Sequence, residues 1–526
     1  MNIRRWVVAL GLLLCANACS SGGGGSDEDT EFASWEKFRH DGANTGQAAG
    51  ELAENGGGVR WRTQIDGSPI RSSPAVGQDD LVYIATQGGT IAALDLKDGA
   101  VRWTVCACDG TGSGVPAICP VGQPPEFGAF VGSPATYFQD TREGKGTYLH
   151  IGSHDGTLLG IRDDAQTRTC TMRFRPRVVT AGAGDTVRAV RFDASPTYTV
   201  NVATFALAAV FGAASVDVEA GGQRRTIGKL YAVNTDGTLS WEFPRLGQPE
   251  IGGITASPVL DSANTVYVTA DDGYLYAIDR DGNLRWRFAV TTATGAPEPF
   301  APSPTTSVTI FAPTVDGTIV AVNPDGTFSW RTRAPDGASF IASLAVGLPA
   351  VTPTPTASPE PSATPAPDVT ASPTPTATPV LSSFEIFAVT RNGAVLAVNV
   401  RTGQRRLVDV SSGPIAGPVV SSPALSGDAY LVIGDASGRL HALDTTTGLQ
   451  PEGWPVLLSP DLAILSSPAI DADGFVYVGT MDGYLYSIGD TAEPTAVPTH
   501  TPTPTRTVAA TATRTVTPQL TAVIEP

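Results

Sequence analysis

The chain has 526 residues, and its 41% hydrophobic content is sufficient to bury large cores. Its 57 Gly and 42 Pro favour a turn-rich β protein over a helical one. With 51 acidic and 34 basic side chains the net charge is −17, so there is no overall electrostatic attraction to nucleic acid or anionic lipid, and nucleic-acid binding is not expected.

The N-terminal residues 1–18 predict an export signal. A basic head precedes the apolar core Trp6–Leu14, which is too short to span a bilayer as a helix. A small residue before Cys19 resembles the bacterial lipoprotein processing box, so we expect lipidation of Cys19 and a flexible acidic tether over 19–34. A plain secretory signal with a nearby cut is the alternative. Ser20, in place of Asp after the cysteine, resembles lipoproteins sent on to the outer membrane of a Gram-negative cell.

A repeated unit organises most of the remaining chain. Its clearest copy is DDGYLYAIDRDGNLRW at Asp271–Trp286, and close relatives stand at Gly88–Trp103, Asp316–Trp330 and Asp482–Asp490. Paired Asp-Gly turn signals with alternating apolar runs between them predict hairpins of short strands. The step from the clearest copy to the next one along the chain is 44 residues, a length typical of propeller blades of four strands each.

Each unit predicts the same order of strands. A small-residue motif such as SSPAV at Ser72–Val76 suits a crowded inner strand near the axis, and a second strand such as Val266–Ala270 follows. A third strand comes next, and the outer strand carries Trp. Units from inner to third strand are predicted at 72–95, 131–162, 192–234, 255–279, 301–323, 340–399, 419–444 and 466–488. The predicted fold is therefore an all-β, eight-bladed propeller over residues 35–490, or a seven-bladed one if the irregular third unit is not a blade.

The outer-strand aromatic residues indicate how the ring closes. They are predicted at Trp61, Trp103, Phe174, Trp241, Trp286, Trp330 and Trp454. Trp61 precedes the first unit, whereas the last unit ends at Ile488 without a Trp strand of its own. We therefore expect Val59–Ile65 to be the outer strand of the last blade.

These motifs resemble the pyrroloquinoline-quinone-like β-propeller repeat family, whose blades read roughly W…SSPAV…VYVGS.DG.LYALD..TG..W. The segment Trp35–Gly46 (WEKFRHDGANTG) is also similar to the opening motif of that family, W..F..D..NTG. The family spans quinoprotein dehydrogenases and non-catalytic scaffolds, so the resemblance implies the fold and leaves the function open. In kind, the chain is most similar to the propeller lipoproteins of the outer-membrane β-barrel assembly machinery, which are scaffolds in a complex.

Resemblance to the dehydrogenases would imply pyrroloquinoline quinone (PQQ) and Ca²⁺ in the central channel, a pair of adjacent Cys residues and an acidic catalytic base. The chain has no Cys-Cys dipeptide, and no residue of those sites is identified in it. The acidic clusters Asp79–Asp80 and Asp471–Asp473 fall where an inner strand turns into a second strand, and the turn alone needs Asp and Gly there. The five His residues show no ligand spacing. We therefore predict no catalytic residue, no cofactor and no metal.

Two Pro/Thr-rich stretches, 347–380 and 491–526, lack the aromatic and branched residues of a core, and we expect both to be disordered. The first splits a blade between an inner strand at Phe340–Val346 and a second strand at Phe384–Val389. The sequence leaves three interpretations of this insertion open: a spacer, a glycosylated stalk or a neutral low-complexity expansion.

Four cysteines remain after the signal and the lipidation site: Cys106, Cys108, Cys119 and Cys170. In an exported protein they predict two disulfides, with all three pairings open. A metal site is the alternative.

An arginine cluster is the strongest candidate for a binding surface. Its residues are Arg173, Arg175, Arg177, Arg188, Arg191, Arg224 and Arg225. Arginine forks bind carboxylates and phosphates, so we expect the cluster to contact an acidic partner from one face over the first three blades, with Arg175–Arg191 as a loop. A solvated loop that balances local acid charge is the alternative.

The predicted function is that of a monomeric, non-catalytic, exported lipoprotein that acts as a protein-binding scaffold at the cell envelope. A quinone-dependent dehydrogenase using PQQ and calcium is one alternative. A cell-surface recognition module is the other.

Overall fold

The structure is a computed structural model. It describes residues 35–41, 44–52, 56–105, 128–141, 144–164, 169–174, 185–201, 206–290, 303–306, 309–347, 384–410, 414–427 and 429–490. The predicted signal 1–18, the tether 19–34 and the tail 491–526 lie outside the described residues, as does the predicted insertion 347–380 apart from Gly347.

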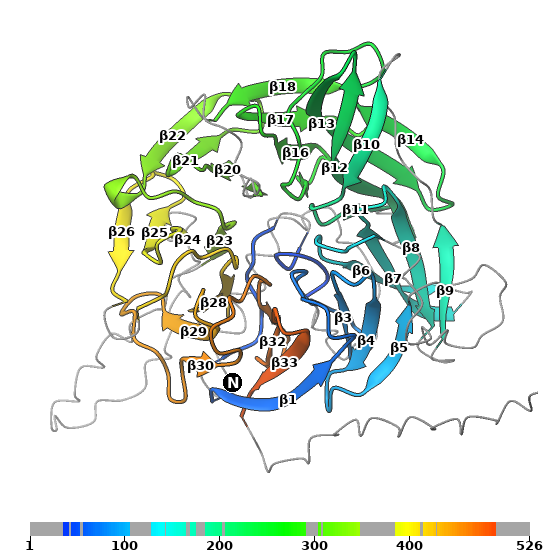
Figure 1. Ribbon diagram of the computed structural model, residues 1–526. Coiled ribbons are helices and arrows are strands. Elements are labelled where there is room, and N and C mark those ends of the chain that lie inside the picture. Colours follow the sequence, from blue (N-terminus) through cyan, green and yellow to red (C-terminus); the bar gives the residue numbers. More distant parts are fainter. Residues whose placement is uncertain are drawn as a thin grey trace, which may run out of the picture. The chain divides into compact units, whose positions relative to one another are not determined.

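The described residues form eight sheets, arranged as the blades of a closed ring (Figure 1). The first four blades are β2 (Ala75–Val76), β3 (Leu81–Ala85), β4 (Ile91–Asp95) and β5 (Val101–Val105); β6 (Ala135–Thr141), β7 (Gly144–Gly152), β8 (Leu158–Asp164) and β9 (Thr169–Phe174); β10 (Thr186–Arg191), β11 (Thr197–Asn201), β12 (Ala206–Ala220), β13 (Gln223–Asn234) and β14 (Leu239–Phe243); and β15 (Val259–Leu260), β16 (Val266–Thr269), β17 (Tyr274–Ile278) and β18 (Leu284–Ala289). The last four are β19 (Thr305–Thr306), β20 (Ile310–Pro313), β21 (Thr318–Val322) and β22 (Phe328–Arg333), followed by the short helix η1 (Pro335–Gly337); β23 (Ala345–Gly347), β24 (Glu385–Val389), β25 (Val395–Asn399) and β26 (Arg405–Val408); β27 (Ala424–Leu425), β28 (Tyr430–Gly434), β29 (Arg439–Asp444) and β30 (Val456–Leu457); and β31 (Ala469–Ile470), β32 (Val476–Gly479), β33 (Tyr484–Gly489) and β1 (Gly58–Gln64). The eight-bladed prediction is confirmed, and the irregular third unit is a blade.

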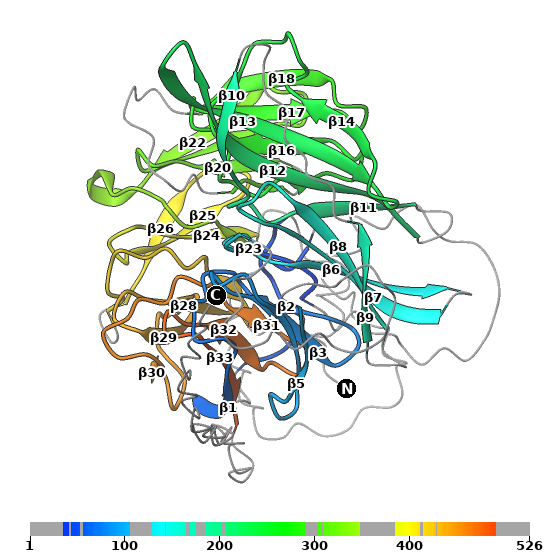
Figure 2. The same cartoon turned by 45° about the vertical axis from the view of Figure 1, so that its right-hand side comes forward.

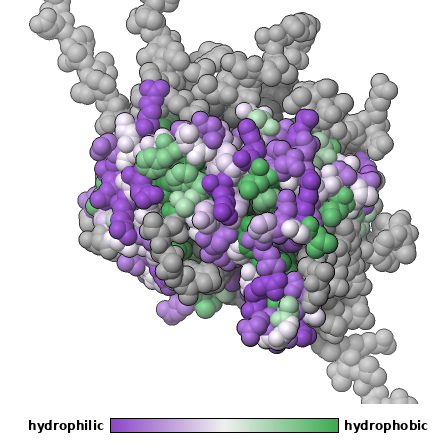
Figure 3. Space-filling view, turned by 90° about the horizontal axis from the view of Figure 1, so that it is seen from above, coloured by the Kyte–Doolittle hydropathy of each residue, from purple (hydrophilic) through white to green (hydrophobic). Residues whose placement is uncertain are grey.

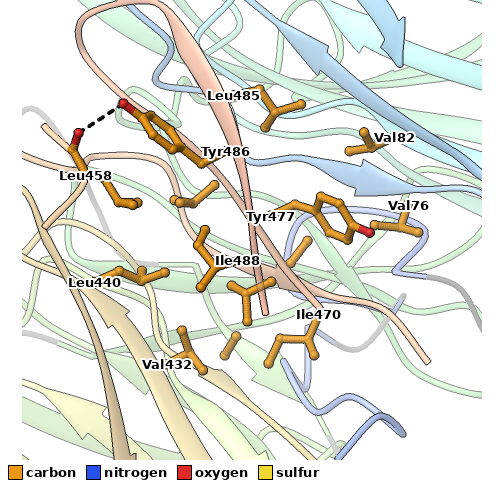
Figure 4. Packing of buried hydrophobic residues seen from close by; sticks show 14 of the residues in the cluster. Val76, Val82, Val432, Leu440, Leu458, Ile470, Tyr477, Leu485, Tyr486 and Ile488 are labelled. Carbon is orange, nitrogen blue, oxygen red and sulfur yellow. Dashed lines mark hydrogen bonds between the residues drawn. The ribbon is translucent and has the colours of Figure 1, made fainter. Parts of the chain in front are cut away.

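The ring closes between the N-terminal strand and the last blade. β1 pairs antiparallel with β33, from Gly58 opposite Gly489 to Gln64 opposite Tyr484, and the two strands lie side by side in Figure 1. Figure 4 shows the core around this blade, in which Tyr477 lies toward Val76 of the first blade. The predicted closure by the segment around Trp61 is therefore confirmed.

The outer-strand aromatic residues join neighbouring blades. Trp241 of the third blade donates its Nε1–H to the carbonyl oxygen of Arg280 at 2.8 Å and covers Gly282 of the fourth blade. Gly282 has a φ of +82°, and a Cβ there would lie 2.7 Å from the indole ring. Both the turn and the docked ring therefore require glycine. The same contact places Trp61 on Gly99, Phe174 on Gly237, Trp286 on Gly326 and Trp330 on Gly403.

A ring of serines links the inner strands around the axis. The backbone N–H of each serine donates to the hydroxyl of the corresponding serine in the next blade at 2.7–3.1 Å, and Ser467 of the last blade returns to Ser73 of the first. The members of this serine ring are Ser73, Ser133, Ser195, Ser257, Ser303, Ser343, Ser422 and Ser467. The recurring Ser-Pro motif thus supplies a side chain small enough for the axis that also accepts a hydrogen bond.

The connections between strands emerge on two sides of the ring. Each connection from an outer strand to the next inner strand lies beside a turn between a second and a third strand. For example, the N–H of Asp271, in such a turn, donates to the oxygen of Gly253, in such a connection, at 2.9 Å. The prediction that these two kinds of connection share a side is therefore confirmed. Inner-to-second and third-to-outer connections share the other side, as when the Val400 N–H donates to the Phe384 oxygen at 3.2 Å. β23 and β24 pair directly, so β23 ends and β24 begins on this second side.

The N-terminal residues 35–41 and 44–52, here called the axial segment, lie at the centre of the ring on this second side (Figure 1). The Trp35 oxygen accepts the Val76 N–H of the first blade at 2.8 Å. The Gly46 oxygen accepts the Leu425 N–H of the seventh blade at 2.7 Å. The axial segment therefore ties together blades from different parts of the ring. None of the described residues belongs to a helix with the length and apolarity that a membrane span requires.

Candidate functional site

The third blade carries an extension that the other described blades lack. β12 and β13 are 15 and 12 residues long. β11 pairs with the first half of β12, whereas β10 pairs with its second half, so this sheet has five strands. We call the outer part of this sheet, residues 185–191 and 215–227, the arm. The arm stands out at the top of Figure 2, on the side of the second-to-third turns.

The arm has one apolar face and one charged face. Val190, Val216 and Val218 are buried and belong to the core of the third blade. Successive strand residues point to opposite faces, so Asp217 and Glu219 lie on the other face of β12.

Three arginines of the predicted cluster pair with these two acids. Arg188 Nε and Arg224 Nε lie 3.1 and 3.0 Å from the same Glu219 oxygen. Arg191 donates to both carboxylate oxygens of Asp217. The hydrogen bonds from Arg188 and Arg224 hold the pKa of Glu219 below its ordinary value.

A fourth arginine joins the arm to its neighbour loop. Arg225 Nη2 lies 2.6 Å from Glu250 and 2.9 Å from Asp185. These hydrogen bonds, that of Glu250 foremost, raise the pKa of Arg225 above its ordinary value. The four arginines thus face four acids, and this surface is balanced in charge rather than basic.

The ion pairs of the arm are open to solvent at its tip. The Arg224 side chain is 78% exposed and that of Arg188 is 51% exposed. Exposed pairs of this kind contribute only about 0–1 kcal/mol to stability. Their arginines are therefore available to exchange partners at little cost to the fold.

Of the other predicted cluster residues, only Arg173 is described, and it lies in the second blade. Arg173 is exposed in β9, and Arg175 and Arg177 lie outside the described residues. The expectation that Arg175–Arg191 is a loop is wrong for its last six residues, which form β10 because the long β12 offers them a partner. Sequence reasoning also missed the facing acids. The alternation in SVDVEA (215–220) was the signal that could have found them, since it places two carboxylates on one strand face.

Further acids lie at the base of the arm. His154 Nε2 lies 2.9 Å from Asp193 Oδ1. Burial, with the neighbouring Asp272 carboxylate, raises the pKa of Asp271 to about 6, and Arg191 opposes this shift. The side of the ring that bears the arm therefore mixes both signs of charge.

Of the two acidic clusters at inner-to-second turns, Asp79 accepts hydrogen bonds from the Tyr83 hydroxyl at 2.7 Å and from the Thr147 hydroxyl of the second blade at 2.6 Å, whereas Asp471 serves its own turn and the strand that follows. Asp471 accepts the Phe475 N–H at 2.9 Å and the Tyr477 hydroxyl at 2.8 Å. Within the part of the chain that the structure describes, no group of three or more His, Cys, Asp or Glu is arranged to hold a metal ion. The absence of a cofactor stays a prediction.

The predicted disulfides and the predicted lipid anchor stay predictions. Cys19, Cys106, Cys108 and Cys119 lie outside the described residues. Cys170 lies in β9, opposite Asp163 of β8.

Exposed apolar side chains are spread around the ring rather than gathered. Leu239, Leu284 and Phe328 stand near the start of three successive outer strands and are 43%, 45% and 52% exposed. Figure 3 shows hydrophobic groups of this part of the ring separated by hydrophilic ones. The arm, and not an apolar patch, is therefore the candidate binding surface.

The chain matches the family described as outer membrane protein assembly factor BamB over residues 46–188, 226–354 and 364–451, about two thirds of its length. The unmatched residues 189–225 contain most of the arm. No curated protein matches the chain at a significant level.

Solved structures show the same fold at low sequence identity. BamB from Moraxella catarrhalis is 15% identical, with a TM-score of 0.50 over 82% of this chain and 99% of that one. The quinohemoprotein alcohol dehydrogenase from Comamonas testosteroni is 14% identical, with a TM-score of 0.55 over 93% of this chain and 83% of that one. A europium-containing methanol dehydrogenase is 14% identical, with a TM-score of 0.54 over 88% of this chain and 98% of that one. At these identities the likeness concerns the fold alone.

Proposed function

From the premise that the chain belongs to the family of the outer membrane protein assembly factor BamB, we propose that it is a non-catalytic propeller that binds a protein partner at the envelope of a Gram-negative cell. Export by residues 1–18 and a lipid on Cys19 hold it at the outer membrane, facing the periplasm or the surface. The propeller acts as a monomeric scaffold, and the arm is its binding surface.

The arm is the observation that carries this proposal. Seven blades of the described ring are complete with four strands, so a fifth strand and a lengthened hairpin are not needed to build a blade. Most of the arm also falls in residues 189–225, which the family pattern does not match, so we infer that the arm is an addition to the common fold. Its ion pairs contribute little to stability. Binding is the use that accounts for all three features.

The chemistry of the arm favours a partner with acidic groups. Arg188 and Arg224 share one oxygen of Glu219 and each uses its Nε for that contact. Each guanidinium has further N–H groups, and a planar fork binds a second carboxylate well. Acidic side chains of a partner can therefore add to these pairs, and the balanced charge of the arm makes the contact selective rather than generally attractive to anions.

A shortened arm tests the proposal. Removing Val218–Ala220 and Gln223–Arg225 leaves Gly221 and Gly222 as a turn between Asp217 and Thr226, which already face each other in the register. Affinity capture from an envelope extract should lose the partner with this variant, while circular dichroism and thermal unfolding show an intact propeller.

A charge variant and a control separate recognition from general charge effects. Arg188→Ala with Arg224→Ala should weaken capture and reduce its sensitivity to salt. Arg280→Ala is the matched control, because Arg280 is 77% exposed in a third-to-outer turn on the opposite side. Undiminished capture by the shortened arm would refute the proposal.

The other candidate function is a quinone-dependent dehydrogenase, since solved dehydrogenases share the fold. A dye-linked assay with added PQQ and Ca²⁺ distinguishes it, and we expect no turnover. A cell-surface recognition module is distinguished by whether the captured partner comes from the envelope or from outside the cell.

A further inference from the structure

A tyrosine hydroxyl stands between two acids where the first blade meets the second. Tyr83 belongs to β3 of the first blade and is fully buried. Its hydroxyl oxygen lies 2.7 Å from Asp79 Oδ2, in the turn before β3, and 2.9 Å from Asp163 Oδ2, in β8 of the second blade. The hydroxyl oxygen of Thr147, in β7, lies 2.6 Å from the same Asp79 oxygen. Two of these three contacts therefore cross from one blade to the next.

The three contacts need more hydrogens than the two hydroxyl groups supply. A hydroxyl has one hydrogen to donate, and an ionised carboxylate has none. Each contact at hydrogen-bond distance between two oxygens needs a hydrogen, and Tyr83 and Thr147 provide one each. The hydrogen for the third contact therefore comes from one of the two carboxyl groups.

Burial favours Asp163 as the holder of this proton. The residue is 1% exposed, whereas Asp79 is partly exposed. With the proton on Asp163 Oδ2, that carboxyl donates to the Tyr83 oxygen, and Tyr83 and Thr147 both donate to Asp79 Oδ2. Every short contact then has its hydrogen, and the chain of donors ends on a single carboxylate.

The charges around the two acids favour keeping the proton. Among the described residues, no basic side chain forms an ion pair with Asp79 or Asp163. Asp80 and Asp164 are acids, and Arg162 Nη2 lies 3.8 Å from Asp164. Burial, with the neighbouring Asp79 and Asp164 carboxylates, raises the pKa of Asp163 to about 6. Burial also raises the pKa of Asp79.

The contact between tyrosine and aspartate recurs in two other blades without a second acid. The Tyr267 hydroxyl donates to Asp261 at 2.8 Å in the fourth blade, and the Tyr477 hydroxyl donates to Asp471 at 2.8 Å in the last one. In both places one hydroxyl meets one acid among the described contacts, so no carboxyl proton is needed. Asp163 is therefore an addition to this contact.

We propose that Asp79 and Asp163 share one bound proton in the folded protein, and that its release at higher pH loosens the junction between the first and second blades. Without the proton, one of the three contacts loses its hydrogen, and two buried carboxylates repel each other across the junction. The turn that holds Asp79 lies on the side of the ring opposite the arm, so the proposal does not depend on partner binding.

The pH dependence of stability tests the shared proton. Because the pKa of Asp163 is raised in the folded state, the folded chain holds a proton that the unfolded chain has lost, and stability should fall as the pH rises through about 6. Asp163→Asn has a permanent N–H donor in place of the carboxyl proton. Relative to this variant, the unfolding equilibrium constant of the wild type should rise about thirtyfold between pH 4.5 and pH 7.5 in urea titrations.

The matched control is Asp261→Asn, which changes the same contact in the fourth blade, where one acid faces the tyrosine. Its unfolding should keep the pH dependence of the wild type. Equal pH dependence of the wild type and Asp163→Asn would overturn the proposal.

Amide hydrogen exchange locates the loosening. The wild type and Asp163→Asn are compared at the same pH, so that the intrinsic exchange rates cancel. At pH 8 the amides of β3 and β8 should exchange at least about tenfold faster in the wild type, whereas those of β16 and β17 should not differ. Equal exchange in β3 and β8 would show that release of the proton does not loosen this junction, which contradicts the proposal.

Neutron diffraction from wild-type crystals grown at pH 5 in heavy water gives a readout that does not depend on whether a variant folds. Three deuterium positions, one on each contact of Tyr83 and Thr147 with the two acids, support the shared proton. Only two deuterium positions, both belonging to the hydroxyl groups, would overturn it.

Discussion

Closure of the ring by β1 predicts a large cost for Trp61→Ala. Trp61 is 4% exposed, lies on Gly99 of the first blade and stands 5.9 Å from the Tyr477 ring. Its Nε1–H donates to the Leu96 oxygen at 3.0 Å. One side chain therefore joins the last blade, through its borrowed outer strand, to the first.

The magnitude follows from burial. A buried Trp removes about 200 Å² from water, which at about 25 cal/mol per Å² corresponds to about 5 kcal/mol. The lost hydrogen bond adds about 1 kcal/mol. The unfolded chain already buries part of this surface, and buried Trp→Ala changes cost about 3–5 kcal/mol. We expect about 4 kcal/mol for Trp61→Ala.

Urea unfolding followed by far-ultraviolet circular dichroism measures the change without relying on Trp fluorescence. The matched control is Val59→Ala in the same strand, where Val59 is 40% exposed and should cost less than about 1 kcal/mol. Deleting residues 59–65 should leave β33 with an open edge and cost far more than deleting residues 491–526. If Trp61→Ala cost no more than Val59→Ala, or if the two deletions melted at the same temperature, closure by β1 would be refuted.

Three further predictions test the axis and the anchor. Burial lowers the pKa of Lys37 from 10.5 to about 7, so between these values the unfolded chain binds a proton that the folded chain does not, and stability should rise with pH. Lys37→Met should reduce this slope by up to about 1.4 kcal/mol per pH unit, measured by urea titrations from pH 7 to 10; an unchanged slope contradicts the burial argument. Ser257→Ala removes the acceptor of the Ser195 N–H and should cost about 1–3 kcal/mol in urea unfolding, because a buried donor is left unpaired; a loss below about 0.5 kcal/mol would mean that water replaces the hydroxyl. Cys19→Ser should move the protein from the membrane pellet to the soluble fraction, and a mutant that still pellets in high salt rules out the lipid anchor.

The amino-acid sequence by itself determined the blades and their closure. Each blade is a local meander, so its Asp-Gly turns, alternating apolar runs and outer Trp lie within a few tens of residues and can be recognised as one pattern. Trp61 could be assigned to the last blade because the repeat begins with an outer strand and ends without one. The family resemblance rests on the same local motifs, and the family match confirms it.

The candidate site could be predicted only in part. The sequence identified Arg188, Arg191, Arg224 and Arg225, which the structure brings onto one surface. Local charge balance was only the alternative, and the acids that face the arginines could not be identified because they come from strands and loops up to 40 residues away. Which acid lies opposite which arginine depends on the register of β10 and β13 on β12, and a register is a property of paired strands rather than of either strand alone.

Tertiary structure also decided what lies at the axis. The serine ring is made of hydrogen bonds between blades, each joining residues 40 or more positions apart, so the repeated Ser-Pro motif predicts small inner strands but not their linkage. In the same way, Lys37 and Arg39 stand in a polar sequence that has no feature of a core. They are buried because strands from several blades converge on that segment, and only the closed ring brings those strands together.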